Sequence, residues 1–346
     1  MTHTGIRHRV WLTVPVPRLP GSSRLLGLVA SSILVAAACS DPPRPELSDE
    51  TLPVVPAMEE GEEVDDGALM MEAAPAEPRV LITPTGVVVP IVADLTDSYS
   101  VVTPCGNRVR VVWGTPITEA DIVLDPGHGG EVETGAVGPN GLTEKELNLD
   151  LAKRTARILE QRGISVVLTR SSDYRIPLET RAEIANVLEA EALVSIHHNA
   201  PTANTSSTPG TEVFIQDGND ESARLGGILQ EEILEALDQF DITWSIATDP
   251  GAIVVLNDSG VDSYGMIRRP EMPAVLAELG YLSNPEEAEL FATDRYRDVA
   301  ATALADGIER WLTTDDPGSG FRDEPRLFTP SSGTGGTDGC VDPELG

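Results

Sequence analysis

The sequence has little positive charge, few histidines and few cysteines. Each of these shortages excludes some classes of partner or catalytic site. Lysine and arginine number 24 against 56 aspartates and glutamates, which gives a formal net charge of -32 at pH 7. Such a surface repels nucleic-acid phosphate and anionic lipid, so we expect no nucleic-acid partner. The acidity itself identifies no substrate, because it serves solubility in many secreted proteins.

The sequence lacks the usual motifs of serine hydrolases and of cysteine hydrolases. No G-x-S-x-G motif is present, and neither Cys105 nor Cys340 lies in a C-x-x-C pair or near a histidine. Serine catalysis, cysteine catalysis and a cysteine metal site therefore lack support. An even pair of cysteines in an exported chain instead predicts a disulfide that ties Cys340 in the C-terminal tail to Cys105, with two free thiols as the alternative.

The uncharged stretch near the N-terminus is too short for a permanent membrane span. Four arginines in the first 24 residues precede 14 uncharged residues, 25–38. A spanning helix needs about 20. Residues 1–39 therefore predict an export signal that is removed. The small residues before Cys39 resemble a bacterial lipobox, with Ala36 where leucine is usual, so Cys39 is the predicted lipidation site. Cleavage nearby by an ordinary signal peptidase is the alternative.

Composition divides the rest of the chain into four parts. Residues 40–79 are rich in proline and acidic side chains, which predicts a disordered linker that could hold a domain off a membrane. Residues 80–119 are rich in valine, isoleucine and threonine, which predicts three or four short antiparallel strands in a small β extension. Strand and helix patterns alternate over 120–313, which predicts a single α/β domain. Residues 314–346 read as a disordered tail.

The α/β region has a definite order of elements. Apolar runs between turn residues predict strands at 122–125, 165–170, 192–196, 212–215 and 274–279. Helical spacing predicts helices near 144–161, 179–190, 221–240, 285–292 and 295–312.

The few histidines are concentrated in two motifs. Of five, two fall in the predicted signal, and the others lie in D-P-G-H-G-G (125–130) and S-I-H-H-N (195–199). Each motif directly follows a strand-like run. Because ligands bind at the carboxyl ends of strands in open α/β sheets, His128 and His197 would converge if their strands are neighbours.

Two histidines suggest a hydrolytic zinc site, which needs three protein ligands and one open position. The third ligand must then be a carboxylate. Glu144, at the start of the helix after the His128 loop, is our candidate, and Glu146 is the competing choice. The two would point about 200° apart on a helix, so only one can face the metal. Glu144 could alternatively serve only to stabilise the helix N-terminus.

Hydrolysis also needs a base that takes a proton from the attacking water. Glu278 fits this role, since it lies in the buried-looking strand P-A-V-L-A-E-L-G-Y, where an unpaired carboxylate is costly. The alternative is a structural ion pair of Glu278 with Arg268 or Arg269. His198 would point to the opposite face of its strand from His197.

The motifs together resemble the zinc-dependent N-acetylmuramoyl-L-alanine amidases of the bacterial cell wall, the amidase_3 type. The resemblance runs from about residue 122 to 312 and includes, in the expected order, IVLDPGHGG, GLTEKELNLDLA, GISVVLTRSSD, LETRAEIAN, LVSIHHNA, PGTEVFI and PAVLAELGYLSNPEE. It implies hydrolysis of the amide between N-acetylmuramic acid and the L-alanine of the stem peptide, in cell-wall remodelling or cell separation. The implied fold is a single domain with a twisted, mostly parallel sheet of about six strands flanked by helices.

Carried over position by position, the resemblance implies one zinc ion held by His128, Glu144 and His197, and a catalytic role for Glu278. His198 stands where the family often has alanine.

We also expect substrate contacts from Asn199 and Arg268. The implied partner is peptidoglycan or its muropeptides, and we expect an extracytoplasmic monomer, anchored in the membrane through Cys39 or secreted to the wall. The alternatives are an exported zinc peptidase acting on a related peptide and a non-catalytic or regulated wall-binding lipoprotein.

Overall fold

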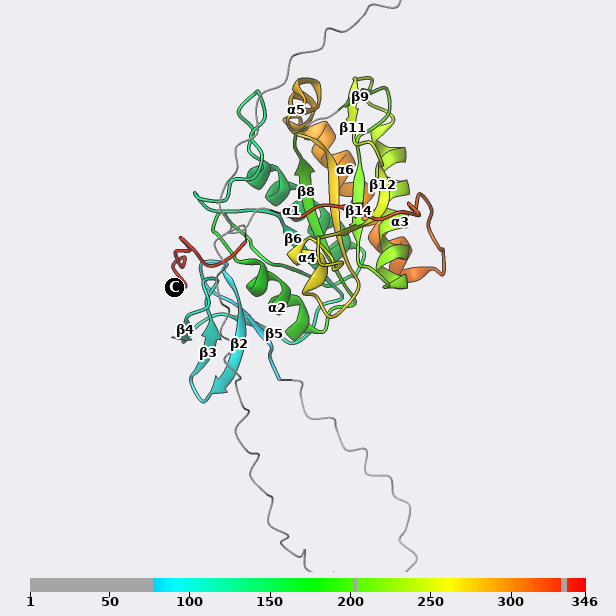
Figure 1. The fold of residues 1–346 in the computed structure, drawn as a ribbon. Helices are drawn as coiled ribbons and strands as arrows, with labels where there is room; N and C mark the ends of the chain where they lie inside the picture. The colour runs from blue at the N-terminus through cyan, green and yellow to red at the C-terminus, as the bar shows by residue number, and fades with distance from the viewer. Residues whose placement is uncertain (1–76, 202–203, 331–334) are drawn as a thin grey trace, which may run out of the picture. The chain divides into compact units, whose positions relative to one another are not determined.

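A computed structural model describes residues 77–201, 204–330 and 335–346 (Figure 1). The predicted export signal, the lipidation site at Cys39 and nearly all of the predicted linker lie outside these residues. Within the described ranges, no helix is both long enough and apolar enough to cross a bilayer.

A sheet of seven strands forms the centre of the domain, in the order β14-β12-β10-β13-β8-β6-β7. All neighbours are parallel except β10 and β13. The predicted mostly parallel sheet flanked by helices is thus confirmed. The strands are β6 (Ile122–Pro126), β7 (Val166–Leu168), β8 (Ala192–Asn199), β10 (Glu212–Ile215), β12 (Gly251–Leu256), β13 (Ala274–Tyr281) and β14 (Arg326–Leu327).

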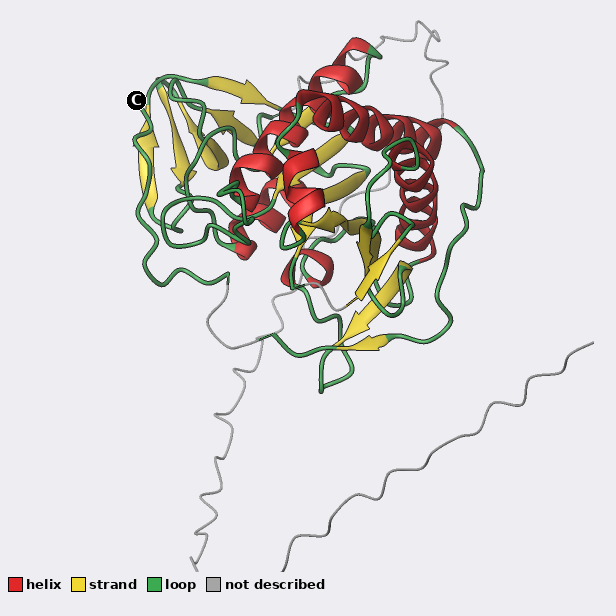
Figure 2. Cartoon of the chain, turned by 90° about the horizontal axis from the view of Figure 1, so that it is seen from above, coloured by secondary structure: helices red, strands yellow, loops and turns green. Residues whose placement is uncertain are grey.

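Helices cover both faces of this sheet. Side chains alternate between the two faces of each strand, so these buried strands present apolar side chains on both. In β6, Ile122 and Leu124 face the larger core with three long helices, whereas Val123 faces the second core with α2. Figure 2 shows the helices in red and the strands in yellow. The helices are α1 (Glu144–Gln161), α2 (Leu178–Leu188), α3 (Asp220–Leu237), α4 (Gly265–Arg268), α5 (Pro285–Phe291) and α6 (Asp294–Thr313).

The β extension is an antiparallel sheet of five strands, in the order β4-β3-β2-β1-β5. Its valines belong to the second core, together with α2 and the face of the large sheet that α2 covers. The extension is therefore packed onto the domain. A separate two-stranded sheet pairs β9 with β11. The bounds are β1 (Val80–Ile82), β2 (Val88–Leu95), β3 (Ser98–Val102), β4 (Arg108–Val111), β5 (Thr115–Ile117), β9 (Asn204–Ser206) and β11 (Trp244–Ile246).

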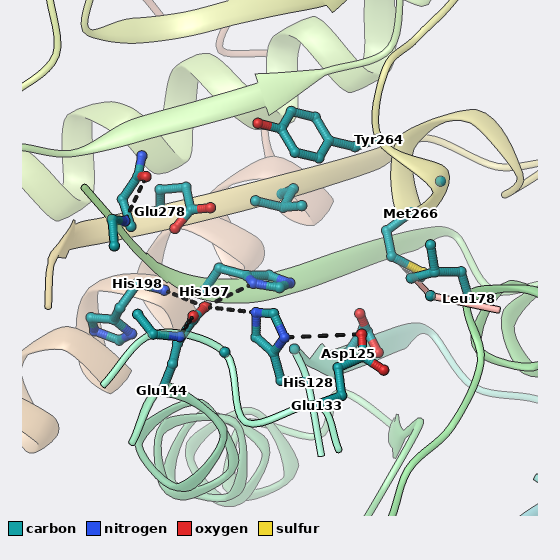
Figure 3. Close-up of a pocket in the computed structure, with 18 of the residues that line it drawn as sticks. Asp125, His128, Glu133, Glu144, Leu178, His197, His198, Tyr264, Met266 and Glu278 are labelled. Carbon is teal, nitrogen blue, oxygen red and sulfur yellow. Dashed lines mark hydrogen bonds and ion pairs between the residues drawn. The ribbon is translucent and has the colours of Figure 1, made fainter. Parts of the chain in front are cut away.

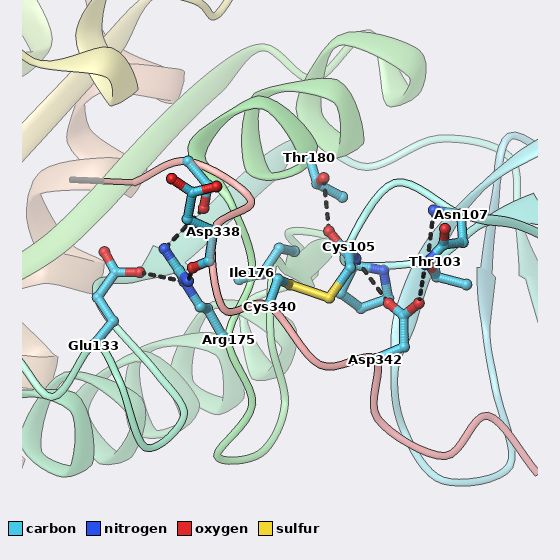
Figure 4. The surroundings of a disulfide bond; sticks show 12 residues. Thr103, Cys105, Asn107, Glu133, Arg175, Ile176, Thr180, Asp338, Cys340 and Asp342 are labelled. Atoms are coloured by element: carbon cyan, nitrogen blue, oxygen red, sulfur yellow. Dashed lines mark hydrogen bonds and ion pairs between the residues drawn. A yellow bond between two sulfur atoms is a disulfide. The ribbon is translucent and has the colours of Figure 1, made fainter. Parts of the chain in front are cut away.

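The C-terminal tail differs from the expected disordered segment. After α6 it runs to the edge of the large sheet, where β14 pairs in parallel with β12 (Figure 1). Residues 335–346 then lie against α2 and the β extension, and Cys340 forms a disulfide with Cys105 (Figure 4). Hydrogen bonds, the ion pairs of Arg326 and one disulfide hold the described parts of the tail, and none of these leaves an apolar period in the sequence.

Candidate metal centre

The loop after β6 places His128 at the carboxyl end of the sheet. His128 has a φ of 62°, an uncommon conformation for a residue other than glycine. Gly127 is required beside it, because a Cβ there would lie 2.2 Å from the ring of His197. Since β6 and β8 are neighbours, the two imidazoles meet edge to face with their centroids 5.0 Å apart.

Glu144 completes the cluster from the first turn of α1. Its Oε1 lies 3.2 Å from His128 Nε2 and 3.0 Å from His197 Nδ1. One candidate ligand atom from each of the three residues lies within 4.8 Å of the others (Figure 3). Glu146 is exposed and accepts a hydrogen bond from Thr143 Oγ1 at 2.7 Å, so it faces away from the cluster.

The donor set fits the zinc ion that the family resemblance implies. Two imidazoles and one carboxylate are a common ligand set of catalytic zinc, and metal ligands must be deprotonated. Burial raises the pKa of Glu144, but the hydrogen bonds and charges of the two histidines outweigh it and hold that pKa well below its ordinary value. The carboxylate is therefore ionised at neutral pH. His128 Nδ1 is buried without a hydrogen-bond partner among the described residues and lies 4.0 Å from Glu133 Oε1.

Glu278 lies on β13 directly beside His197 in the strand register. Its Oε2 is buried and has no hydrogen-bond partner in the described part of the chain. Burial, together with the charges of Glu144 and Glu212, raises the pKa of Glu278 well above its ordinary value, while Arg326 opposes this shift. An unpaired buried carboxylate is expensive, and such groups are often functional.

Among the described residues, neither Arg268 nor Arg269 forms the alternative ion pair with Glu278. Arg268 donates hydrogen bonds to the carbonyls of Asp262 and Ser263, and Arg269 lies 3.7 Å from Glu179.

His198 supports the centre from behind. As expected, its side chain lies on the opposite face of β8 from His197, where it hydrogen-bonds with Asn148 at 2.9 Å and Tyr296 at 2.9 Å. Burial lowers the pKa of His198 to about 3, so the ring is neutral. Its backbone N–H also donates to Glu144 Oε1 at 3.1 Å.

Two buried arginines that the sequence analysis did not single out hold the His128 loop. Arg170 donates to the carbonyls of Pro126 and Gly127, both at 2.9 Å. Arg181 donates to the His128 carbonyl at 2.7 Å and pairs with Asp125, also at 2.7 Å. Both arginines lie inside the quoted motifs, V-L-T-R and L-E-T-R-A, but a motif does not reveal that a guanidinium is buried.

A cavity of about 390 Å³, here called the cleft, opens above the cluster. The three candidate ligands, Glu278 and Asn199 line it. Asn199 also donates to Glu212 Oε2 at 2.9 Å. Arg268 does not line the cleft, because α4 directs its exposed side chain back to its own preceding loop. The predicted substrate contact by Arg268 is therefore not supported by its position. One wall of the cleft is apolar and is formed by Leu178, Tyr264, Met266, Leu276 and Phe328.

Comparisons with known proteins identify the family of the matched region. A family model described as N-acetylmuramoyl-L-alanine amidase matches residues 122–310. YqiI, an uncharacterised protein of Bacillus subtilis, is 33% identical over 212 residues, which cover 60% of this chain and 90% of YqiI. The N-acetylmuramoyl-L-alanine amidase AmiC of Neisseria meningitidis is 30% identical over 220 residues, which cover 56% of this chain and 53% of AmiC.

Among solved structures, Cwp6 from Clostridium difficile is similar with a TM-score of 0.50 and 25% sequence identity. The similarity covers 59% of this chain and 32% of that chain. The β extension and the tail after α6 lie outside the residues that the family model matches. Because that match covers more than half of the sequence, the chain belongs to the Amidase_3 family of N-acetylmuramoyl-L-alanine amidases.

Proposed function

We propose that the protein is a zinc-dependent amidase that cleaves the amide between the lactyl group of N-acetylmuramic acid and the L-alanine of the stem peptide. The observation that carries this proposal is the convergence of His128, Glu144 and His197 beside the buried, unpartnered carboxylate of Glu278. Two imidazoles and one carboxylate match the three protein ligands that a catalytic zinc site uses.

The residues of the cleft divide the reaction between them. His128, Glu144 and His197 would hold the ion, which supplies Lewis acidity to the scissile carbonyl and to water when bound. Glu278 takes a proton from the water whose oxygen attacks the carbonyl carbon. It then gives that proton to the alanine nitrogen as the C–N bond breaks, which yields a carboxyl group and a free amine. Its raised pKa gives Glu278 a higher proton affinity than an exposed glutamate has.

The proposed setting is the cell wall. The exported character rests on the signal predicted at 1–39, and membrane attachment rests on lipidation of Cys39. The acidic, proline-rich residues 40–79 would then give the catalytic domain reach from the membrane to the glycan, for wall remodelling or cell separation.

The direct test is incubation of the purified full chain with muropeptides, followed by mass spectrometry of the products. We expect a glycan fragment and a stem peptide that begins with free L-alanine. A chelator should abolish the reaction and added zinc should restore it. Cleavage within the stem peptide would favour the exported zinc peptidase instead. Binding without cleavage by a folded, zinc-loaded protein would favour the wall-binding lipoprotein.

A further inference from the structure

The tail segment around β14 contributes a side chain to the cleft from outside the matched family region. Phe328 follows β14 directly and lines the cleft together with Glu278. Its backbone is fixed on both sides, since its N–H donates to the Leu256 carbonyl at 2.9 Å and its carbonyl accepts a hydrogen bond from Ser263 Oγ. The position of this ring is therefore set by the fold.

Phe328 is the outermost ring of an aromatic stack. Phe214 and Tyr264 stack with centroids 4.9 Å apart and an interplanar angle of 11°, and Tyr264 and Phe328 follow at 5.8 Å and 26°. The guanidinium of Arg326 lies 5.6 Å from the centroid of Phe214 at the inner end. Phe328 nevertheless remains 45% exposed. A rigid aromatic ring with open surface inside a cleft is suited to ligand contact.

The charges around the cleft indicate which part of a muropeptide would bind beside Phe328. Four carboxylates line the cleft, and two of them are paired, Asp125 with Arg181 and Glu133 with Arg175. Arg181, the one arginine of the lining, is buried and engaged in that pair. Arg326, two residues before Phe328, is paired with Glu212 and Asp249. A stem peptide carries carboxylates of its own, and the described lining of the cleft offers no unpaired arginine or lysine to bind them. The glycan is uncharged once its lactyl group is amidated, and the C–H faces of its sugar rings are apolar.

We propose, resting on the amidase function above, that Phe328 is a specificity-determining residue that packs against a sugar ring of the glycan. The tail would thus complete the substrate site that the family domain begins. Loss of the ring should raise KM and leave kcat nearly unchanged, because Phe328 contacts the substrate away from the reacting amide.

The experiment compares Phe328→Ala with Phe321→Ala in the full chain. Phe321 is a matched control: it lies on the same tail, is also 45% exposed and packs against Gly227 of α3 outside the cleft. The substrates are one stem peptide attached to glycans of one, two and four sugars, and one disaccharide carrying stems of two to five residues.

We expect Phe328→Ala to raise KM about tenfold on the longer glycans, the loss that follows from uncovering part of an aromatic face. Its kcat should stay within about twofold of the wild-type value. Phe328→Trp should restore KM, and Phe321→Ala should leave it unchanged. If Phe328→Ala misfolds by circular dichroism, Phe328→Leu decides, because leucine keeps apolar bulk without the flat face.

The outcomes separate the two proposals. Wild-type protein that cleaves no muropeptide would remove the amidase function and this inference with it. An active wild-type protein with an unaltered KM in Phe328→Ala would overturn this inference alone. A KM effect that grows with stem length and is indifferent to glycan length would overturn the assignment to sugar.

Discussion

At the scale of single residues, Glu144 is the most constrained side chain of the centre. Oε1 contacts both imidazoles and accepts the His198 N–H, while Oε2 accepts the Ala136 N–H at 2.8 Å. Asn148 Nδ2 also donates to Oε1 at 3.3 Å, and these five contacts fix both the position and the ionised state of the carboxylate. Any metal held here depends on that negative charge.

The substitution Glu144→Gln tests this dependence. Glu146→Gln, two residues further along α1, is the matched control. Glutamine keeps the shape but removes the charge, so we expect loss of stoichiometric zinc and at least a hundredfold loss of kcat, measured by metal analysis and muropeptide cleavage. The exposed Glu146→Gln should retain both. Full zinc and full activity in Glu144→Gln would contradict the assigned ligand.

Glu278→Gln should separate catalysis from metal binding. Zinc content should be retained while kcat falls about 10²- to 10⁴-fold, as for loss of a general base. The metal-free variant should also melt at a higher temperature than metal-free wild type at pH 7, because burial raises the pKa of Glu278 and its ionised form is unfavourable in the fold. A zinc-loaded Glu278→Gln that cleaves at the wild-type rate would refute the role of base.

At the scale of elements, the ends of β6, β7 and β8 are joined to α2 by a single buried carboxylate. Asp125 accepts hydrogen bonds from Thr169 Oγ1 at 2.5 Å and Ser195 Oγ at 2.6 Å, and it pairs with Arg181 at 2.7 Å. Burial raises the pKa of Asp125, but Arg181 and the two hydroxyls outweigh it and lower that pKa to about 2. The charge therefore stabilises the arrangement that supports the His128 loop.

This lowered pKa predicts how Asp125 contributes to stability as the pH changes. A depressed folded pKa gives stability that is present above about pH 4 and is lost as the pH falls toward 2, on the order of 2 kcal/mol. Asp125→Asn should be less stable than wild type at pH 7, since Arg181 is left unpaired. The difference in unfolding free energy, measured by denaturant titration, should shrink between pH 4 and pH 2. A difference independent of pH would refute this account.

The elements also show how far the sequence could be interpreted. Strands β8 and β13 were predictable because a strand buried on both faces reads as a continuous apolar run. The same signal is present in β12 (G-A-I-V-V-L), which the sequence analysis left unassigned. Strand β14 has only two residues, which is too short for a residue pattern to indicate it. The convergence of His128 and His197 was predictable from the strand ends, whereas the contribution of Phe328 depends on where the tail runs.

At the scale of the whole molecule, the tail closes the structure. Cys105 and Cys340 are separated by 235 residues, and the disulfide is supported by Asp342, which accepts hydrogen bonds from the Cys105 N–H at 2.8 Å and Asn107 at 2.7 Å (Figure 4). Arg175 holds the approaching tail through the carbonyls of Gly336 and Asp338. The β extension and the tail, both outside the family match, are thus fastened to each other.

Removing this link should destabilise the protein substantially. A disulfide that closes a long loop contributes about 2–5 kcal/mol, so the double variant Cys105→Ser, Cys340→Ser should melt at a lower temperature than the oxidised wild type. Reductant should lower the melting temperature of the wild type to that of the double variant. The double variant is its own control, since it should not respond to reductant. Equal melting of all three samples would show that the link contributes nothing.

The same link changes what a single peptide-bond break can do. Any cut between Cys105 and Cys340 opens a covalent ring without dividing it, so the two pieces stay joined and can remain folded around the cleft. A molecule nicked by a protease in this interval would thus keep both histidine motifs and Phe328 in one covalently joined molecule. The disulfide therefore protects the cleft against the effect of a single chain break as well as stabilising the intact fold.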